Sequence, residues 1–501
     1  MFLSTCVNAI VHNPRDTDMT ALPPIRQHEG IRLRIAFVGL LLCLALQGMR
    51  AQGDRPIRLE LPADKYSSEL QCAICDTLGL CLIYPTFDID TPVAHIDHYD
   101  VNLMPLEQHT LRLPINYIYV ASTYSTGDLF VLYQEKIKKK KTPAGVLLHV
   151  RPGSSQIDTL HIRNLPVNDI TRFTCCNNTL LFTSPTGRES SNLFYLPIHQ
   201  PIVHGLFLKN APEYSIDDFI ADTVNQRIFV CANLASNSKD NVIWLCESNM
   251  SGEIQRIIDL PDTGIYRFQN ARITLFEDEH LFIAGTYQMR KSSPYNTATG
   301  VYALLYKEGA FTEPELHPYE PLAAGKVEVL YLPGRLFRDS THVALVTESF
   351  YPEYRYSTTY SYGVPTTEPI FVGYRFINAD VRLFDADGHL AGTYDFPFDN
   401  MLVTNLTTHL RVAFSPGQIL FYHMLNQSLI TMLTDDQLNV IDPIRAVEIF
   451  PQENRNTPMV YTTALYPWYK SYYLLSGYRF RNTGSSKNRN AVFFLNKLRY
   501  Q

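Results

Sequence analysis

The sequence lacks the compact motifs by which many enzymes are identified. It contains no Gly-x-Ser-x-Gly nucleophile elbow, no His-Glu-x-x-His zinc motif, no phosphate-binding Walker loop and no dinucleotide fingerprint. Charged residues make up only 18% of the chain, below the usual share of about a quarter. The net charge of -6 argues against a nucleic-acid partner, because such binders are normally basic. We therefore predict no cofactor and no bound metal, and we favour a protein that is not an enzyme.

Long apolar runs are also scarce. The main one is Ile35–Leu46, twelve residues, with Arg32 and Arg34 before it and the small Ala51 after it. A basic start, an apolar centre and a small residue at the cleavage point are typical of a secretory signal. As a helix this run reaches about 18 Å, whereas the hydrocarbon core of a bilayer is roughly 30 Å thick. We predict a leader and signal over residues 1–51, export to the periplasm, the cell surface or the medium, and no membrane span in the mature chain.

The cysteines leave two alternatives open. Seven of them follow the signal, and an odd number leaves at least one thiol free. Cys231 and Cys246 fall on neighbouring predicted strands, where they form either a disulfide or two buried thiols. The pairs Cys72–Cys75 and His95–His98 have zinc-ligand chemistry, but the gap between them is longer than in a zinc finger.

Aromatic residues are plentiful, with 31 Tyr and 27 Phe, and they favour pleated, half-buried strands. Short apolar segments bounded by turns recur at steps of 48 to 76 residues, and we interpret each as the same element of a repeated unit. Most are followed by a second apolar segment, which we interpret as a hairpin return. The seven first segments are Leu129–Tyr133, Thr179–Thr183, Arg227–Ala232, His280–Gly285, His342–Thr347, Gln418–His423 and Tyr472–Gly477.

Helical signals are few. Residues 64–81 place Leu70, Ile74 and Leu78 about one helical turn apart, which favours a helix there. Residues 441–450 are a candidate for one further turn. Neither segment changes the predicted class, which is all-β.

The repeated unit resembles the blade of a β-propeller, a fold that protects its sheet edges. The resemblance covers residues 107–501 and implies four-stranded blades, seven being favoured and six or eight being the alternatives. Residues 52–106 are then an N-terminal segment with a short helix. The later units share a pattern, because Tyr351–Arg355 and Tyr466–Lys470 each precede a Gly-Tyr-Arg-Phe sequence. The Trp-Asp signature, the kelch Gly-Gly pairs and the sialidase Asp-box are missing, so the resemblance implies no residue-level function.

Two Tyr-rich segments are the predicted ligand-binding surfaces. One interrupts a predicted strand pair as a long loop and is too polar for a core, and the other lies in the last unit. Tyrosine offers a large, stiff contact area with a polar tip, as recognition loops require. The alternative is packing between neighbouring blades. The candidate residues are Tyr351, Tyr354, Tyr356, Tyr360, Tyr362, Tyr466, Trp468 and Tyr469.

These patterns favour an exported, non-catalytic propeller that binds a protein or a glycan through its loop face. One alternative is a polysaccharide-active propeller enzyme, which carboxylates converging on the central channel would support. Another is a structural part of an envelope assembly. The basic run Lys138, Lys139, Lys140 and Lys141 lies at a predicted hairpin tip and is a candidate for peripheral contact with the envelope.

Overall fold

A computed structural model describes most of the chain after residue 56. The predicted signal over residues 1–51, the four lysines at 138–141 and Tyr362 lie outside the described residues. Residues Pro56–Gln501 form one compact unit. The described residues are 57–63, 70–88, 91–136, 143–154, 156–163, 165, 169–186, 190–200, 202–206, 208, 213–234, 242–261, 264–276, 280–290, 298–320, 328–361, 364–399, 401–425, 428–448, 459–469, 472–481 and 490–499.

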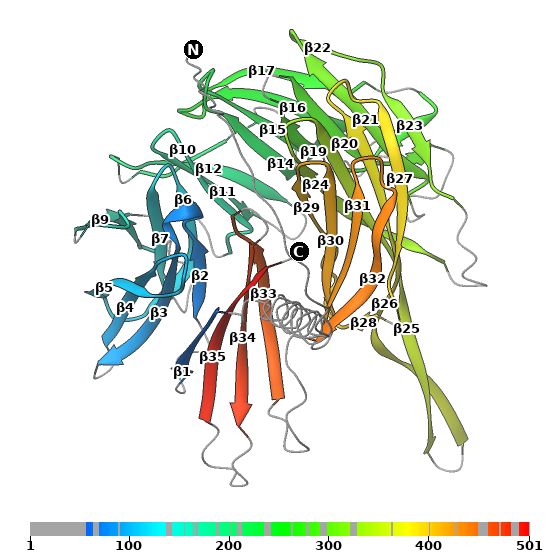
Figure 1. Ribbon diagram of the computed structural model, residues 1–501. Coiled ribbons are helices and arrows are strands. Elements are labelled where there is room, and N and C mark those ends of the chain that lie inside the picture. The colour runs from blue at the N-terminus through cyan, green and yellow to red at the C-terminus, as the bar shows by residue number, and fades with distance from the viewer. Residues whose placement is uncertain are drawn as a thin grey trace, which may run out of the picture. The chain divides into compact units, whose positions relative to one another are not determined.

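The described residues form eight antiparallel sheets, numbered I to VIII in chain order (Figure 1). Sheet I contains β2 (Gln71–Ile74), β3 (Leu80–Asp88), β4 (Thr91–Tyr99) and β5 (Pro105–Arg112). Sheet II contains β6 (Tyr117–Ser125), β7 (Asp128–Glu135), β8 (Gly145–Val150) and β9 (Ile157–Ile162). Sheet III contains β10 (Arg172–Cys176), β11 (Thr179–Pro185), β12 (Ser191–Pro197) and β13 (His204–Gly205). Sheet IV contains β14 (Tyr214–Asp222), β15 (Arg227–Leu234), β16 (Val242–Asn249) and β17 (Ile254–Asp259).

The later sheets follow the same order, and two of them carry extra short strands. Sheet V contains β18 (Tyr266–Phe268), β19 (Arg272–Leu275), β20 (Leu281–Met289), β21 (Gly300–Lys307), β22 (Ala310–Phe311) and β23 (Glu315–Pro318). Sheet VI contains β24 (Leu330–Arg338), β25 (His342–Ser361), β26 (Val364–Asp385), β27 (Leu390–Pro397) and β28 (Leu402–Val403). Sheet VII contains β29 (Arg411–Ser415), β30 (Gln418–Leu425), β31 (Ser428–Asp435) and β32 (Val440–Glu448). Sheet VIII contains β33 (Met459–Pro467), β34 (Tyr472–Arg481), β35 (Asn490–Arg499) and β1 (Ile57–Ala63).

The first described strand completes the last sheet. β1 pairs antiparallel with β35, with Leu59 opposite Leu495 and Ala63 opposite Ala491. Residues from both ends of the compact unit therefore share one sheet, and unfolding either end removes a strand from it.

Each sheet is buried on both faces by apolar clusters shared with the sheets before and after it. In β7, Leu129 and Val131 pack towards sheet I, whereas Phe130 and Leu132 pack towards sheet III. Successive side chains of a strand point to opposite faces, which explains why this strand is continuously apolar. Two further clusters join sheet VII to VIII and sheet VIII to I. The order of packing thus closes on itself, and the fold is an all-β propeller.

The seven predicted repeat segments are confirmed as equivalent elements. They lie in β7, β11, β15, β20, β25, β30 and β34, which are the second strands of sheets II to VIII. The second strand of sheet I, β3, completes the series. Seven blades were favoured from the sequence, with six or eight as the alternatives, and the described residues form eight sheets, the first of which comprises residues 71–112.

The helical expectation for residues 64–81 is wrong over the described part. Residues Gln71–Ile74 form β2, and the only helical element there is η2 (Asp76–Leu78), a three-residue 3-10 turn. Gly79 closes this turn with φ of 116°, a conformation that favours glycine. Of the apolar residues that suggested one helical face, Leu70 and Ile74 pack against the cluster between sheets VIII and I, whereas Leu78 is exposed in the 3-10 turn. Residues 441–448 likewise belong to strand β32. Within the described part of the chain, no helix is long and apolar enough to cross a membrane.

Candidate functional site

Strands β25 and β26 are much longer than their neighbours in sheet VI (Figure 1). The pairing of β24 stops opposite Phe350, the pairing of β27 stops opposite Asn378, and β28 reaches only as far as Tyr374. Beyond these points, residues 351–361 and 364–373 pair only with each other among the described residues. We call this two-stranded extension the ribbon.

The ribbon corrects one expectation about the first Tyr-rich segment. Residues 351–369 were expected to form a loop between strands, whereas the described ones continue the strands themselves. Threonines at 358, 359, 366 and 367 favour this, because β-branched residues suit an extended backbone. Tyrosines two or four residues apart then fall on one face instead of pointing in several directions.

The register of the ribbon divides its side chains between two faces. Tyr354 lies opposite Phe371, Tyr356 opposite Pro369, and Tyr360 opposite Pro365. The aromatic face consists of Tyr354, Tyr356, Thr358, Tyr360, Pro365, Thr367, Pro369 and Phe371. The polar face consists of Arg355, Ser357, Thr359, Thr366, Glu368 and Ile370.

The aromatic face is uncharged and exposed. Tyr356 and Tyr360 are 75% and 76% exposed, and Tyr354 and Phe371 are 49% and 44% exposed. Tyr354 and Phe371 meet edge to face with ring centroids 5.8 Å apart, while the Thr358 and Thr367 hydroxyls hydrogen-bond at 3.0 Å. These cross-strand contacts order the face without covering it.

The base of the ribbon is held by charge and ring packing. Arg375 donates from Nε to the Glu353 carboxylate, and this hydrogen bond lowers the pKa of Glu353 below its usual range. Tyr351, another predicted site residue, lies half-buried at this base and not on the exposed part. Phe350 stacks on Phe376 at 5.5 Å where the ribbon enters the core.

The second predicted aromatic cluster has a different environment. Tyr466 and Trp468 pack against the apolar cluster between sheets VIII and I. The Lys497 ammonium donates to the Tyr469 hydroxyl at 2.6 Å and lies 5.7 Å from the centre of the Trp468 ring. Lys497 also donates to the Val101 carbonyl at 2.8 Å. These residues therefore pack the junction of two sheets around a cation.

The structure does not bring the two aromatic segments together. Trp468 follows the first strand of sheet VIII, whereas the ribbon joins the second and third strands of sheet VI. First-to-second and second-to-third turns lie at opposite ends of an antiparallel sheet. The shared Gly-Tyr-Arg-Phe pattern likewise falls on non-equivalent strands, since Gly373–Phe376 lies in β26 and Gly477–Phe480 in β34.

Carboxylates converging on the central channel were the expected mark of an enzyme. Three buried or partly buried carboxylates of sheets IV and VI instead accept hydrogen bonds from backbone groups of the next sheet. Asp217 accepts from the Ala271 amide at 3.0 Å, and Asp218 accepts from the Ile273 amide at 3.1 Å. Glu348 accepts from two amides of the segment that enters sheet VII, at 2.6 and 2.7 Å. Burial raises the pKa of Asp217 to about 6 and that of Glu348 to about 7. These acids link successive sheets.

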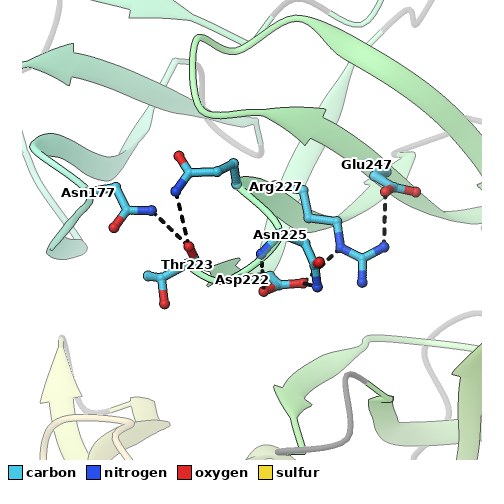
Figure 2. Close-up of polar contacts among 7 residues, drawn as sticks. Asn177, Asp222, Thr223, Asn225, Arg227 and Glu247 are labelled. Atoms are coloured by element: carbon cyan, nitrogen blue, oxygen red, sulfur yellow. Dashed lines mark hydrogen bonds and ion pairs between the residues drawn. The ribbon is translucent and has the colours of Figure 1, made fainter.

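Figure 2 shows a polar cluster at the turn between β14 and β15. Asp222, only 1% exposed, accepts from the Asn225 amide at 3.0 Å and from Arg227 Nε at 2.8 Å. Asn177 of the neighbouring sheet donates to the Thr223 carbonyl at 3.0 Å. Burial raises the pKa of Asp222, but the hydrogen bonds outweigh it and leave the pKa below its usual value. These groups hydrogen-bond one another, so the cluster braces a turn.

The cysteine alternatives are resolved by strand faces. Cys231 belongs to the cluster between sheets IV and V, and Cys246 to the cluster between sheets III and IV. The two thiols lie on opposite faces and are free, so they are buried small side chains. Cys72 and Cys75 also face different clusters, which prevents joint coordination of a metal. Among the described residues, no group of three or more His, Cys, Asp or Glu side chains is arranged to hold a metal ion.

Comparison with protein-family models gives no match, and comparison with curated protein sequences gives none either. Among solved structures, the β-propeller domain of the Trilobed protease from Pyrococcus furiosus is 7% identical, covering 76% of this chain and 95% of that one, with a TM-score of 0.36. The periplasmic gluconolactonase of Pseudomonas aeruginosa is 11% identical, covering 74% and 96%, with a TM-score of 0.38. The polysaccharide lyase Uly1 is 8% identical, covering 76% and 90%, with a TM-score of 0.37. At these values the activities of those proteins are not transferred to this chain.

Proposed function

We propose that this protein is an exported, non-catalytic β-propeller that binds a protein partner through the aromatic face of the ribbon. The observation that carries the proposal is a row of exposed Tyr, Pro and Phe side chains on a two-stranded extension. Aromatic residues are enriched where proteins contact one another, because they give large contact areas at low entropic cost. A protein that exposes such a row on one face of a projecting element has a surface suited to docking.

The edges of the ribbon favour a protein over a glycan. Along residues 351–361 and 364–373, each strand has a neighbour on one side only among the described residues. The outward backbone amides and carbonyls are available to an extended peptide, which can add a strand to such an edge. A glycan can stack on the rings but cannot supply a matching ladder of backbone groups.

The use of the acidic groups supports a non-catalytic role. Two-carboxylate hydrolysis requires one acid to protonate a leaving group and another to attack or activate water. Asp217, Asp218 and Glu348 instead accept hydrogen bonds from the backbone of the following sheets. A carboxylate committed to such bonds is a poor acid–base catalyst, because reaction would require those amides to lose their acceptor.

Photocrosslinking in the native host tests the docking surface. A photoreactive residue at Tyr360, on the aromatic face, is compared with the same residue at Thr359, on the polar face next to it. We expect one protein partner to be captured from position 360 and not from position 359. Equal capture from both positions, or capture of a second copy of this chain alone, would reject the proposal. Binding of the aromatic face to a polysaccharide on a glycan array would also reject it.

Export is tested independently of binding. The N-terminus of the protein purified from the native host should begin after Ala51, and residues 1–51 should direct an attached reporter enzyme across the membrane. An intact N-terminus on a cytoplasmic protein would reject export while leaving the ribbon proposal to its own test.

A further inference from the structure

First strands of four successive sheets line a cavity of about 620 Å³. This volume falls within the range of roughly 300–1,000 Å³ in which proteins bind small molecules. The lining comes from β10, β14, β19 and β24, together with Thr171 just before β10 and one residue of β11, and it is distinct from the ribbon. It consists of Thr171, Arg172, Thr183, Ile216, Asp217, Asp218, Phe219, Ile220, Arg272, Ile273, Thr274, Arg335 and Leu336.

Three arginines on separate strands meet at this cavity, and they are not equally engaged. Arg272 donates from Nε to the Gly334 carbonyl at 3.0 Å and from Nη1 to the Asp217 carbonyl. Arg172 pairs with Asp218. Arg335 is exposed at the cavity wall and makes no hydrogen bond or ion pair with any residue that the structure describes.

The charge of the cavity is positive. Three guanidinium groups face two aspartates, and those aspartates already accept backbone amides of sheet V. Partial burial lowers the pKa of Arg335, the charges of Arg411 and Arg272 lower it further, and the charge of Glu348 opposes this shift in part. Like charges gathered in one place repel each other, and the two aspartates of the lining, one of them paired with Arg172, offset only part of the three positive charges.

We propose that this cavity binds a small molecule bearing an oxyanion, with Arg335 as its main contact. A guanidinium presents a planar fork of donors that matches a carboxylate, sulfate or phosphate group in two parallel hydrogen bonds. Arg272 is held by two backbone carbonyls, so its position is fixed before the ligand arrives, which reduces the ordering cost of binding. The hydroxyls of Thr171 and Thr274 at the wall can hydrogen-bond polar groups of the same ligand.

Calorimetry on the mature protein tests the site with defined probes. Phosphate, sulfate, citrate and glucuronate are titrated separately, and glucose serves as the uncharged control. We expect saturable binding of at least one anion and none of glucose. Comparing the affinities for sulfate and phosphate with those for citrate and glucuronate shows whether the site prefers a tetrahedral oxyanion or a carboxylate. No saturable binding of any of the four anions would overturn the proposal.

Variants assign the binding to the cavity. Arg335→Ala should lower the affinity for the anion about tenfold or more, because charge-assisted hydrogen bonds are stronger than those between neutral groups. Arg335→Lys should weaken it by less, since the charge remains but the fork is lost. The control is Arg151→Ala, which removes an exposed arginine paired with Asp128 in sheet II. An Arg335→Ala protein that is folded, as judged by its melting temperature, and binds the anion as tightly as the parent would overturn the assignment.

Discussion

Strands β25 and β26 have two halves that differ in what surrounds them. In the inner half, Leu345, Val381 and Phe384 are each 0% exposed, because sheets V and VII pack on either side. In the outer half, Tyr356 and Tyr360 are three-quarters exposed, and the strand sequence is richer in Tyr, Thr and Pro. Both halves are paired antiparallel, with register shifts where they meet, between Ser349 and Phe350 and between Glu353 and Tyr354. The difference teaches that one strand pair can serve two purposes, because it is buried where its sequence is apolar and sheets V and VII flank it, and exposed where both conditions end.

The largest expected effect separates the two halves by stability. Phe384→Ala should lower the free energy of unfolding by about 3–5 kcal/mol, because it leaves a cavity beside Phe282, whose ring centroid is 5.3 Å away. Tyr356→Ala should change the free energy of unfolding by less than about 0.5 kcal/mol, because the exposed ring makes few packing contacts in the folded protein. Urea unfolding of both variants measures the contrast. Similar losses for the two would mean that the outer half is also packed.

Acid should destabilise the buried region beside the inner half. Burial lowers the pKa of His423 to about 4, against an ordinary value of 6.5, and its ring packs edge-on to Phe396 and Phe398. The unfolded chain therefore binds a proton more readily, and stability is lost as the pH falls from 6.5 to 4. The gap corresponds to about 3 kcal/mol. His423→Phe should reduce the loss between pH 7 and pH 4.5, and an unchanged loss would contradict this account.

Two glutamates on β25 should respond to pH in different ways. Burial raises the pKa of Glu348 to about 7 from 4.5, so the folded state retains a proton that the unfolded chain has released. This group therefore lowers stability as the pH rises from 4.5 to 7, by up to about 3 kcal/mol. Relative to the parent, Glu348→Gln should gain stability between pH 5 and pH 8.

The matched control for this prediction is Glu353→Gln at the base of the ribbon. It should leave the slope of stability against pH nearly unchanged between pH 5 and pH 8, because the hydrogen bond from Arg375 lowers the pKa of Glu353 and its titration falls below this range. Equal slopes for the Glu348→Gln and parent proteins would show that Glu348 titrates normally. Urea unfolding at four pH values provides the measurement.

The sequence predicts the repeat well where a strand is apolar on both faces. Leu129–Tyr133 and its six counterparts are second strands buried between two sheets, and continuous apolar runs reveal them. The equivalent strand of sheet I is Leu80–Asp88, which contains Pro85. Proline weakens a strand signal, and the preceding residues have a helical spacing, so this unit is not evident from the sequence.

The candidate sites are only partly visible in the sequence. The tyrosines of the ribbon are conspicuous in the sequence because there are so many of them. That they share one face depends on β25 and β26 staying paired beyond the ends of the neighbouring strands, which the sequence does not reveal. The cavity arginines leave no sequence signal, because Arg172, Arg272 and Arg335 come from three different sheets. The aromatic residues around Trp468 are an example of a sequence pattern that is visible but misleading. They resemble the tyrosines of the ribbon in sequence, but they pack around Lys497 and do not form a free surface.

The most direct test of the central proposal is the affinity of the purified crosslinked partner for two matched double variants. Tyr356→Ser with Tyr360→Ser alters the aromatic face, and Arg355→Ser with Thr359→Ser alters the polar face of the same ribbon. Aromatic anchors at an interface are commonly worth about 2 kcal/mol or more, so we predict a loss of about thirtyfold or more for the first variant. The second variant should lose less than about threefold, as expected for contacts at a rim. Equal affinities for the two variants would contradict the assignment of partner binding to the aromatic face.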